Sequence, residues 1–160
     1  KTKLFFEQRD IFLQQLHQDI ELFQKYCKNN NVKPMVRLNG TSDISWEKYG
    51  IFEKYFDVQF YDYTKILNRK VSKYPNYHLT YSRSEDTTEE DILKAFRQNM
   101  NTTVVFKEEI PVVWKVQNQE FKVIDGDVND LRPLDETGVI VGLKAKGDAK
   151  SDTSGFVIHG

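Results

Sequence analysis

Apolar residues at helical spacing open the chain. The residues of this stripe are Phe5, Phe12, Leu16, Ile20, Phe23 and Cys27. Steps of three, four and seven place them on one side of an amphipathic helix, so the pattern predicts a helix over residues 2–28. Three asparagines follow at 29–31. They indicate its end, because Asn tolerates the left-handed backbone found there.

Six short apolar runs follow the asparagines. They cover residues 34–39, 58–63, 77–82, 102–106, 121–125 and 139–144. Runs of this length predict strands. Between the first four runs, segments 45–55, 65–73 and 88–100 are each long enough for a helix. Thr87 and Glu90 have the spacing of a capping box before the last of these helices.

Strands that alternate with single helices favour right-handed crossovers and a mainly parallel sheet. We therefore predict one α/β domain over residues 1–160, with about five to six strands and helices on one face of the sheet. The expected parts are an N-terminal helix at 1–30, βα units at 31–107, a hairpin insertion at 108–124, and a final strand with a Lys- and Gly-rich tail at 125–160.

Alternate strand positions divide into two faces. The apolar face collects Val36, Leu38, Val58, Phe60, Leu79, Tyr81, Val104, Phe106, Val139, Val141 and Leu143. The polar face collects Arg37, Asn39, Gln59, Tyr61, Tyr63, His78, Thr80, Ser82, Thr103, Lys107, Gly142, Lys144 and Lys146. Such a sheet either leaves its polar face open to solvent or curls so that this face lines a cavity, as in a partial TIM barrel. Arg37, His78 and Thr80 lie inside strands, which favours the cavity.

Polar side chains also gather where the predicted strands end, the edge at which parallel α/β folds bind ligands. The candidate ligand-binding residues are Arg37, Asn39, Thr41, Ser42, Lys65, His78, Ser82, Arg83, Glu85, Lys107, Lys144 and Lys146. The candidate acids, bases or metal ligands are Asp43, Asp62, Asp125 and Asp127. The simpler interpretation is that polar residues gather in the loops of any protein.

The segment NGTSD at 39–43 is the candidate anion loop. Its glycine and hydroxyls suit an anion cradled by backbone N–H groups. The same atoms equally suit a turn with a helix N-cap at Ser42 or Asp43.

The acidic segment 125–136 has oxygen ligands at several calcium-loop positions. Its sixth position is Asp130 where that loop needs glycine, which argues against an EF-hand. Asp125 and Asp127 at a strand end suit Mg²⁺ or a phosphate role better, although a solvated acidic turn is the more ordinary interpretation. The lysines of the tail are similarly open to two interpretations, a phosphate clamp or a solvated loop.

Composition excludes several classes of function. Lys and Arg number 23 against 24 Asp and Glu, so the net charge of -1 provides no general attraction to nucleic acid or anionic membrane. Cys27 is the only cysteine and cannot by itself form an intramolecular disulfide or hold an iron–sulfur cluster. No apolar run approaches the roughly 20 residues of a membrane span, so we expect a cytoplasmic protein.

Five phrases resemble a family of bacteriophage and prophage proteins whose activity is unassigned. They are VRLNGTSD (36–43), VQFYDYTK (58–65), YHLTYSRSE (77–85), VIDGDVNDLRPLD (123–135) and GLKAKGDAKSDTSGF (142–156). The resemblance covers nearly the whole chain and implies a phage origin, hence the cytoplasm of a bacterial host cell. It also implies a partial βα barrel similar to radical-SAM proteins. Longer members carry an upstream Cys-rich segment; this chain lacks those cysteines and so is expected to hold no iron–sulfur cluster.

Two functional hypotheses follow. The first is that the protein binds an anionic ligand, phosphate-bearing or nucleotide-like, at the carboxyl edge of its strands, with catalysis and a role for Mg²⁺ left open. The second is a non-catalytic phage effector that binds and inhibits a host protein or a nucleic-acid-associated complex. Direct nucleic-acid binding is the least favoured, because the net charge is close to zero.

Overall fold

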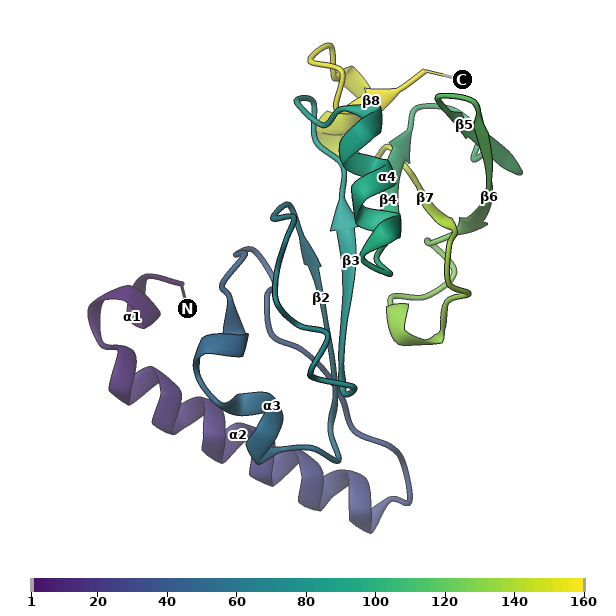
Figure 1. Ribbon diagram of the computed structural model, residues 1–160. Coiled ribbons are helices and arrows are strands. Elements are labelled where there is room, and N and C mark those ends of the chain that lie inside the picture. Colours follow the sequence, from purple (N-terminus) through teal and green to yellow (C-terminus); the bar gives the residue numbers. More distant parts are fainter. Residues whose placement is uncertain (1, 160) are drawn as a thin grey trace.

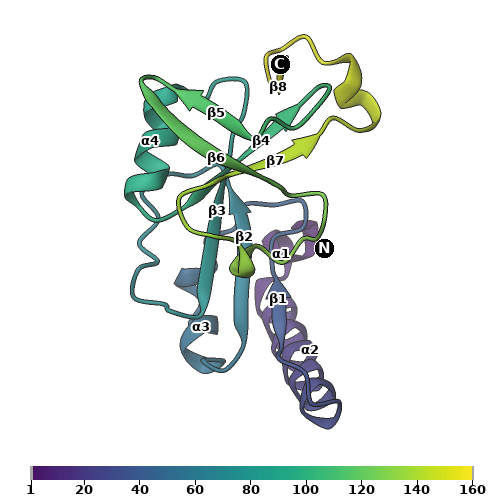
Figure 2. The same cartoon turned by 90° about the vertical axis from the view of Figure 1, so that its right-hand side faces the viewer.

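The computed structural model describes residues 2–159 and contains one open sheet (Figures 1 and 2). The eight strands are β1 (Met35–Arg37), β2 (Gln59–Thr64), β3 (Tyr77–Ser82), β4 (Asn101–Phe106), β5 (Val113–Val116), β6 (Gln119–Asp125), β7 (Ile140–Lys144) and β8 (Val157–Ile158). Their order is β1-β2-β3-β4-β7-β6-β5, and β8 pairs with β4. Every pair is parallel except the antiparallel hairpin of β5 and β6.

The mixed α/β architecture and the mainly parallel sheet agree with the sequence prediction. The sheet has more strands than the expected five or six, because β5 joins it through the hairpin and the two-residue β8 has too short a pattern to be recognised. The sheet does not close: β1 and β5 stand at its two ends. Its expected likeness to a partial barrel stays a prediction.

Four α-helices accompany the sheet. They are α1 (Thr2–Glu7), α2 (Arg9–Asn29), α3 (Ile51–Lys54) and α4 (Glu89–Arg97). The helix expected over 2–28 is interrupted at Gln8, where φ is -140°. It ends as predicted among the asparagines, with Asn31 in the left-handed region at φ 54°.

Two of the expected helices differ in the structure. Residues 45–55 form the short 3-10 helix η1 (Trp46–Lys48) and then α3, with Gly50 between them at φ 66°. Residues 65–73 form no helix: Asn68 adopts φ 61°, and the Arg69 side chain reaches a buried polar network. The capping box of α4 is present one residue later than predicted, between Thr88 and Asp91.

The helices share one face of the sheet. Strand register aligns Phe60, Tyr77 and Leu79 of β2 and β3 on the same side as Val104 and Phe106 of β4. Trp46, Phe52 and Phe5 pack on the β2 and β3 part of this face, whereas Ile92 and Leu93 of α4 pack near β4 with the β5–β6 hairpin. Burial of each such large apolar side chain stabilises the fold by about 1.5–3 kcal/mol.

The face prediction is wrong for β7. Register pairs Val104 with Gly142 and Val105 with Leu143, so Val141 and Leu143 lie on the opposite face from the helices. A Cβ on Gly142 would lie 2.5 Å from the Ile110 side chain. The sequence pattern placed Val141 and Leu143 on the helix-covered face because Gly142 has no side chain to indicate burial. In the structure Gly142 lies on that face and leaves space for the core side chains.

The polar face is covered by the chain's own segment between β6 and β7, residues 126–139. In Figure 2 this yellow-green segment crosses β2 and β3, and its short 3-10 helix η2 (Arg132–Leu134) contacts both strands. Arg132 is 1% exposed, forms an ion pair of 3.3 Å with Asp135, and donates through Nη2 to the carbonyl oxygen of Asn129. This segment therefore covers the middle of the polar face, and the carboxyl edge of the strands lies beyond it.

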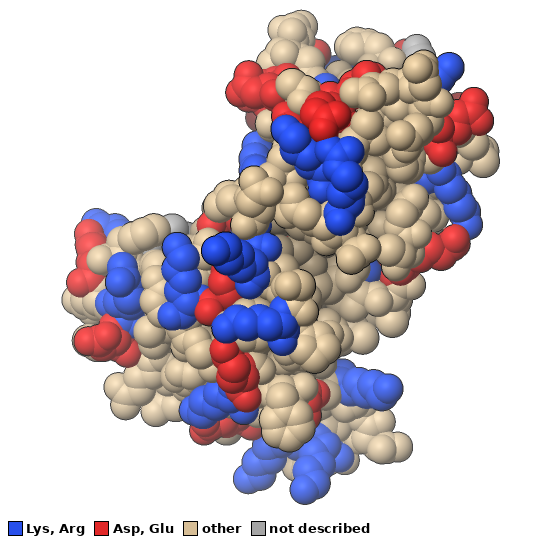
Figure 3. Space-filling model, in the orientation of Figure 1, with Lys and Arg blue, Asp and Glu red and all other residues tan. Residues whose placement is uncertain are grey.

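A short 3-10 helix lies in the C-terminal tail, and charged side chains are spread over the surface (Figure 3). Residues Gly147–Ser151 form η3 in the tail before β8. On the face drawn in Figure 3, basic and acidic side chains are interspersed, in line with the balanced composition. None of the helices in residues 2–159 combines the length and apolar character that crossing a bilayer requires.

Candidate functional site

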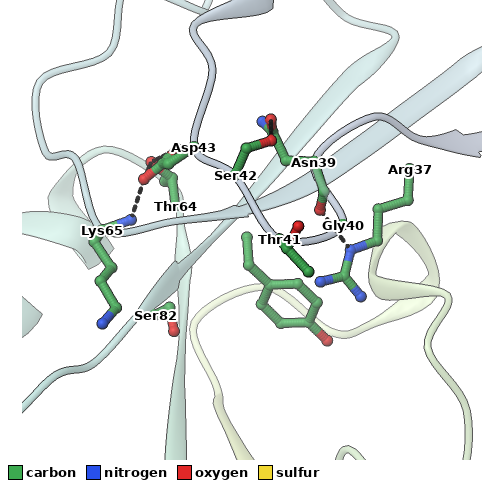
Figure 4. A pocket seen from close by; sticks show the side chains of 10 residues that line it. Arg37, Asn39, Gly40, Thr41, Ser42, Asp43, Thr64, Lys65 and Ser82 are labelled. Carbon is green, nitrogen blue, oxygen red and sulfur yellow. Dashed lines mark hydrogen bonds between the residues drawn. The ribbon is translucent and has the colours of Figure 1, made fainter. Parts of the chain in front are cut away.

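Two contiguous cavities lie at the carboxyl edge of β1 to β4. The first, which we call the loop cavity, holds about 410 Å³ and lies against residues 39–43 (Figure 4). The second, the sheet cavity, holds about 480 Å³ and extends over β4 and β7. Arg37, Tyr63 and Ser82 line both cavities, so the two cavities are neighbours.

Asn39 organises the loop that forms the first cavity. It is 2% exposed, and its Oδ1 accepts hydrogen bonds from the backbone N–H of Ile44, the hydroxyl of Ser42 and the indole of Trp46, each at 3.0 Å. Its own backbone N–H donates to Asp62 at 2.6 Å. The loop is thereby held in one conformation by a buried side chain.

The backbone N–H groups of residues 40–43 are left free by this arrangement. Within residues 2–159, none of the four donates an intramolecular hydrogen bond. All four residues line the loop cavity. Successive free N–H groups in a turn form a concavity that suits an anion.

A buried polar network supports the loop from below. Tyr77 donates to Asp62 at 2.9 Å and accepts from Arg69 at 3.1 Å. Arg69, whose side chain is 2% exposed, also pairs with Glu47 and with Asp43. Burial raises the pKa of Asp62 to about 6, against the lowering effect of its hydrogen bonds from Asn39 and Tyr77.

Three basic side chains lie around the cavities. Arg37 and Lys65 flank the loop cavity from opposite sides in Figure 4, and Arg83 lines the sheet cavity. Arg83 donates from Nη1 to the carbonyl oxygens of Gly155 and Phe156, both at 2.9 Å. In the part of the chain that the structure describes, neither Lys65 nor Arg83 forms an ion pair with a carboxylate.

The carboxylates at the cavities are already engaged. Asp43 accepts from the hydroxyl of Thr64 at 2.9 Å and from the backbone N–H of Lys65 at 2.7 Å. Asp127 accepts from Lys146 at 2.8 Å and from the backbone N–H of Lys144 at 2.9 Å.

Asp130 is the acid that engages a basic group of the cavities directly. Its carboxylate lies 2.9 Å from Arg37 Nη1 and accepts from the hydroxyl of Tyr63 at 3.0 Å. Arg37 also lies over the Tyr63 ring, 4.6 Å from its centre. This contact fastens the segment between β6 and β7 to the end of β1.

A family model described as Gene product 88 matches residues 1–160. The chain belongs to the Gene product 88 family. This is a family of phage gene products, which agrees with the phage origin expected from the sequence. No curated protein and no solved structure matches the chain. The expected link to radical-SAM proteins is not supported by these comparisons.

In this Gene product 88 protein, nine of the predicted site residues line the two cavities. They are Arg37, Asn39, Thr41, Ser42, Asp43, Lys65, Ser82, Arg83 and Asp127. The other seven lie elsewhere and are Asp62, His78, Glu85, Lys107, Asp125, Lys144 and Lys146. The positions of six of these explain why a strand-end or strand-face pattern misplaced them.

Asp62 shares the helix-covered face with Phe60 and is wholly buried, so it supports the loop from below. His78 lies at the opposite end of β3, where burial and the charge of Arg132 lower its pKa. Lys107 follows β4 and lines neither cavity, and its backbone N–H donates to the carbonyl oxygen of Ile158 in β8, which pairs with β4.

Lys144 and Lys146 contact Asp127 instead of lining a cavity. Asp125 accepts from the backbone N–H of Asp127 at 2.9 Å and closes the turn after β6. Among residues 2–159, no three His, Cys, Asp or Glu side chains are grouped so that they could hold a metal ion. The carboxylates considered for Mg²⁺ are therefore used within the protein.

Sequence reasoning missed the residues that support the site. Arg69 and Glu47 lie in segments predicted as helices without any assigned role, and Asp130 was considered only as a mismatch to a calcium loop. Arg132 was not considered at all. No local signal marks Arg132, because an arginine in an acidic turn equally suits a solvated loop.

Proposed function

We propose that this protein binds a phosphate-bearing anionic ligand in the loop cavity. The observation that carries the proposal is the row of free backbone N–H groups at residues 40–43, placed between the side chains of Arg37 and Lys65. Backbone donors fix the position of phosphate oxygens, and the two flanking cations neutralise their charge. Ser42 and Ser82 add hydroxyls at the same cavity.

The helix nearest this edge does not supply the anion site. The first turn of α4 contains Glu89, Glu90 and Asp91, and the Asp91 carboxylate accepts from the backbone N–H of Thr88. These acids already occupy the positive end of the helix dipole. The loop is the better candidate, because its donors have no internal acceptor.

Asp130 competes with the ligand for Arg37. The two side chains of this pair are 31% and 55% exposed, and an ion pair at such exposure contributes only about 0–1 kcal/mol. A phosphate that also receives backbone hydrogen bonds exchanges with it readily. We assign binding to the site, and no reaction, because Asp43 and Asp127 are engaged by other donors.

Isothermal titration calorimetry and thermal unfolding with inorganic phosphate and pyrophosphate, at constant ionic strength, test the proposal. A hundredfold excess over Kd stabilises the folded protein by about 2.7 kcal/mol. For a chain of this size that raises Tm by about 5–10 °C. Lys65→Met should weaken binding about tenfold or more, because it removes a charge-assisted hydrogen bond but keeps the apolar stem.

The matched control is Lys107→Met, which removes an exposed lysine outside both cavities. It should bind phosphate and pyrophosphate as the unmodified protein does. Absence of any heat or Tm change with either anion would overturn the proposal. Equal weakening by the two substitutions would also overturn it, since only general surface charge would then be involved.

A further inference from the structure

We infer that the ligand is a nucleotide, with its phosphate in the loop cavity and its nucleoside part in the sheet cavity. This inference rests on the proposed function, because it takes the phosphate position from it. The two cavities are neighbours that share the lining residues Arg37, Tyr63 and Ser82. A phosphate held beside Arg37 therefore directs the rest of its molecule over β4 and β7.

Two apolar side chains lie on the floor of the sheet cavity, beside Thr103. Val105 of β4 and Leu143 of β7 are register partners and stand side by side on the face away from the helices. The backbone at Gly126 lies close over the same strands, since a Cβ there would lie 2.5 Å from Val141 and 2.9 Å from Leu143. A planar apolar body fits such a floor better than a hydrated sugar does.

One wall of the cavity is aromatic and held in place. Phe156 is half-buried and lines the cavity, and Arg83 donates to the carbonyl oxygens of Phe156 and its neighbour Gly155. These two hydrogen bonds fasten the segment before β8 to the end of β3. Stacking on an aromatic side chain strengthens the binding of any nucleobase, because every base has an apolar face.

The rim of the cavity is polar. Asn129 lines it, and its Oδ1 accepts from the backbone N–H of Leu131 at 2.9 Å. Within residues 2–159 its side-chain N–H₂ donates no hydrogen bond, so this donor is available to a ligand. Asp127 and Asp130 add acceptors on the same side.

This combination separates a nucleoside from other organic groups that carry phosphate. An alkyl chain would fill the floor but would give the side-chain N–H₂ of Asn129 no acceptor. A second anionic group would meet the carboxylates of Asp127 and Asp130. A nucleoside has a base with apolar faces and hydrogen-bond donors at its edges, and a ribose whose hydroxyls donate hydrogen bonds to carboxylates.

Calorimetric titration with three kinds of probe tests the inference: inorganic phosphate, ribose 5-phosphate, and the four common nucleoside 5'-monophosphates. At least one nucleoside monophosphate should bind about tenfold more tightly than ribose 5-phosphate, in the range that base stacking provides. Phe156→Ala should abolish that advantage and leave the affinity for inorganic phosphate unchanged. Phe156→Tyr should retain it. Phe56→Ala, which removes an aromatic side chain that is 79% exposed, is the control and should retain it too.

The outcomes distinguish this inference from the proposed function. If phosphate and the nucleotides bind equally tightly, the inference is overturned and the proposed function stands. If neither binds, the proposed function fails and takes the inference with it. If nucleotides bind more tightly but Phe156→Ala keeps their advantage, the placement of the base is wrong.

A measurement on the unmodified protein covers the case in which Phe156→Ala does not fold. The methyl resonances of Val105 and Leu143 should shift during titration with the nucleotide and stay in place during titration with inorganic phosphate. Methyl shifts confined to residues outside the sheet cavity would overturn the inference.

Discussion

Asp62 should make the stability of the protein fall as pH rises from about 4 to about 7. Its side chain is wholly buried under the loop, and burial raises its pKa from the ordinary 3.8 to about 6. The folded state therefore binds this proton more tightly than the unfolded state does. Stability is greatest below the unfolded pKa and decreases as the pH passes through the folded pKa.

The size of the effect follows from those two pKa values. Their difference corresponds to about 3 kcal/mol of unfolding free energy. Urea unfolding at pH 4, 5, 6 and 7 measures it for the unmodified protein and for Asp62→Asn, which has no proton to lose at this position. The unfolding free energy of the unmodified protein, relative to that of Asp62→Asn, should fall by about 2.4 kcal/mol over this range, since at pH 4 the unfolded carboxyl is already partly ionised.

Asp148→Asn is the control for loss of one carboxylate, because Asp148 is exposed. Its pH dependence should follow that of the unmodified protein. A constant difference between the unmodified protein and Asp62→Asn across the range would refute the reasoning. Should Asp62→Asn fail to fold, the carboxyl carbon resonance of Asp62 gives the same answer: a midpoint near pH 6 supports the account, and a midpoint below pH 4.5 contradicts it.

Three further substitutions probe the segment between β6 and β7. Arg132→Leu should destabilise the protein by about 3 kcal/mol in urea unfolding, because it leaves the Asp135 carboxylate without its ion-pair partner. The double variant Arg132→Leu, Asp135→Leu should be destabilised less than the single variant. A larger destabilisation of the double variant would contradict this. Asp130→Asn should tighten phosphate binding several-fold in calorimetry by releasing Arg37, and unchanged or weaker binding would show that Asp130 does not compete. Gly126→Ala should lower Tm by several degrees, since its Cβ meets three side chains at 2.5 to 2.9 Å; an unchanged Tm would mean that the segment shifts freely.

The sequence pattern predicted those parts of the fold where local periodicity and burial agree. The first helix, the capping of α4 to within one residue, and the parallel strands β1 to β4 all have a strong local signal. Nothing in the sequence of residues 65–73 itself indicates a loop. Its conformation depends on Arg69, which is drawn into contact with Glu47 and Tyr77 from other segments.

The site was predictable to the extent that it depends on strand order. Consecutive parallel strands bring the residues after β1, β2 and β3 to one edge, where Ser42 and Lys65 line the loop cavity and Arg83 lines the sheet cavity. The cover on the polar face was not predictable, because nothing local to η2 specifies that Arg132 lies over β2 and β3. The position of β7 beside β4, which sets the neighbours of Leu143, is equally non-local.

The most direct test of the account follows the backbone amide resonances of residues 40–43 during titration with inorganic phosphate. Because these N–H groups have no acceptor within residues 2–159 and their residues line the loop cavity, they should show the largest shifts in the protein and saturate together with one Kd. Lys65→Met should weaken that Kd, and Lys107→Met should not change it. Resonance shifts spread over surface lysines, or unchanged amide resonances of residues 40–43, would contradict the binding of an anion by this loop.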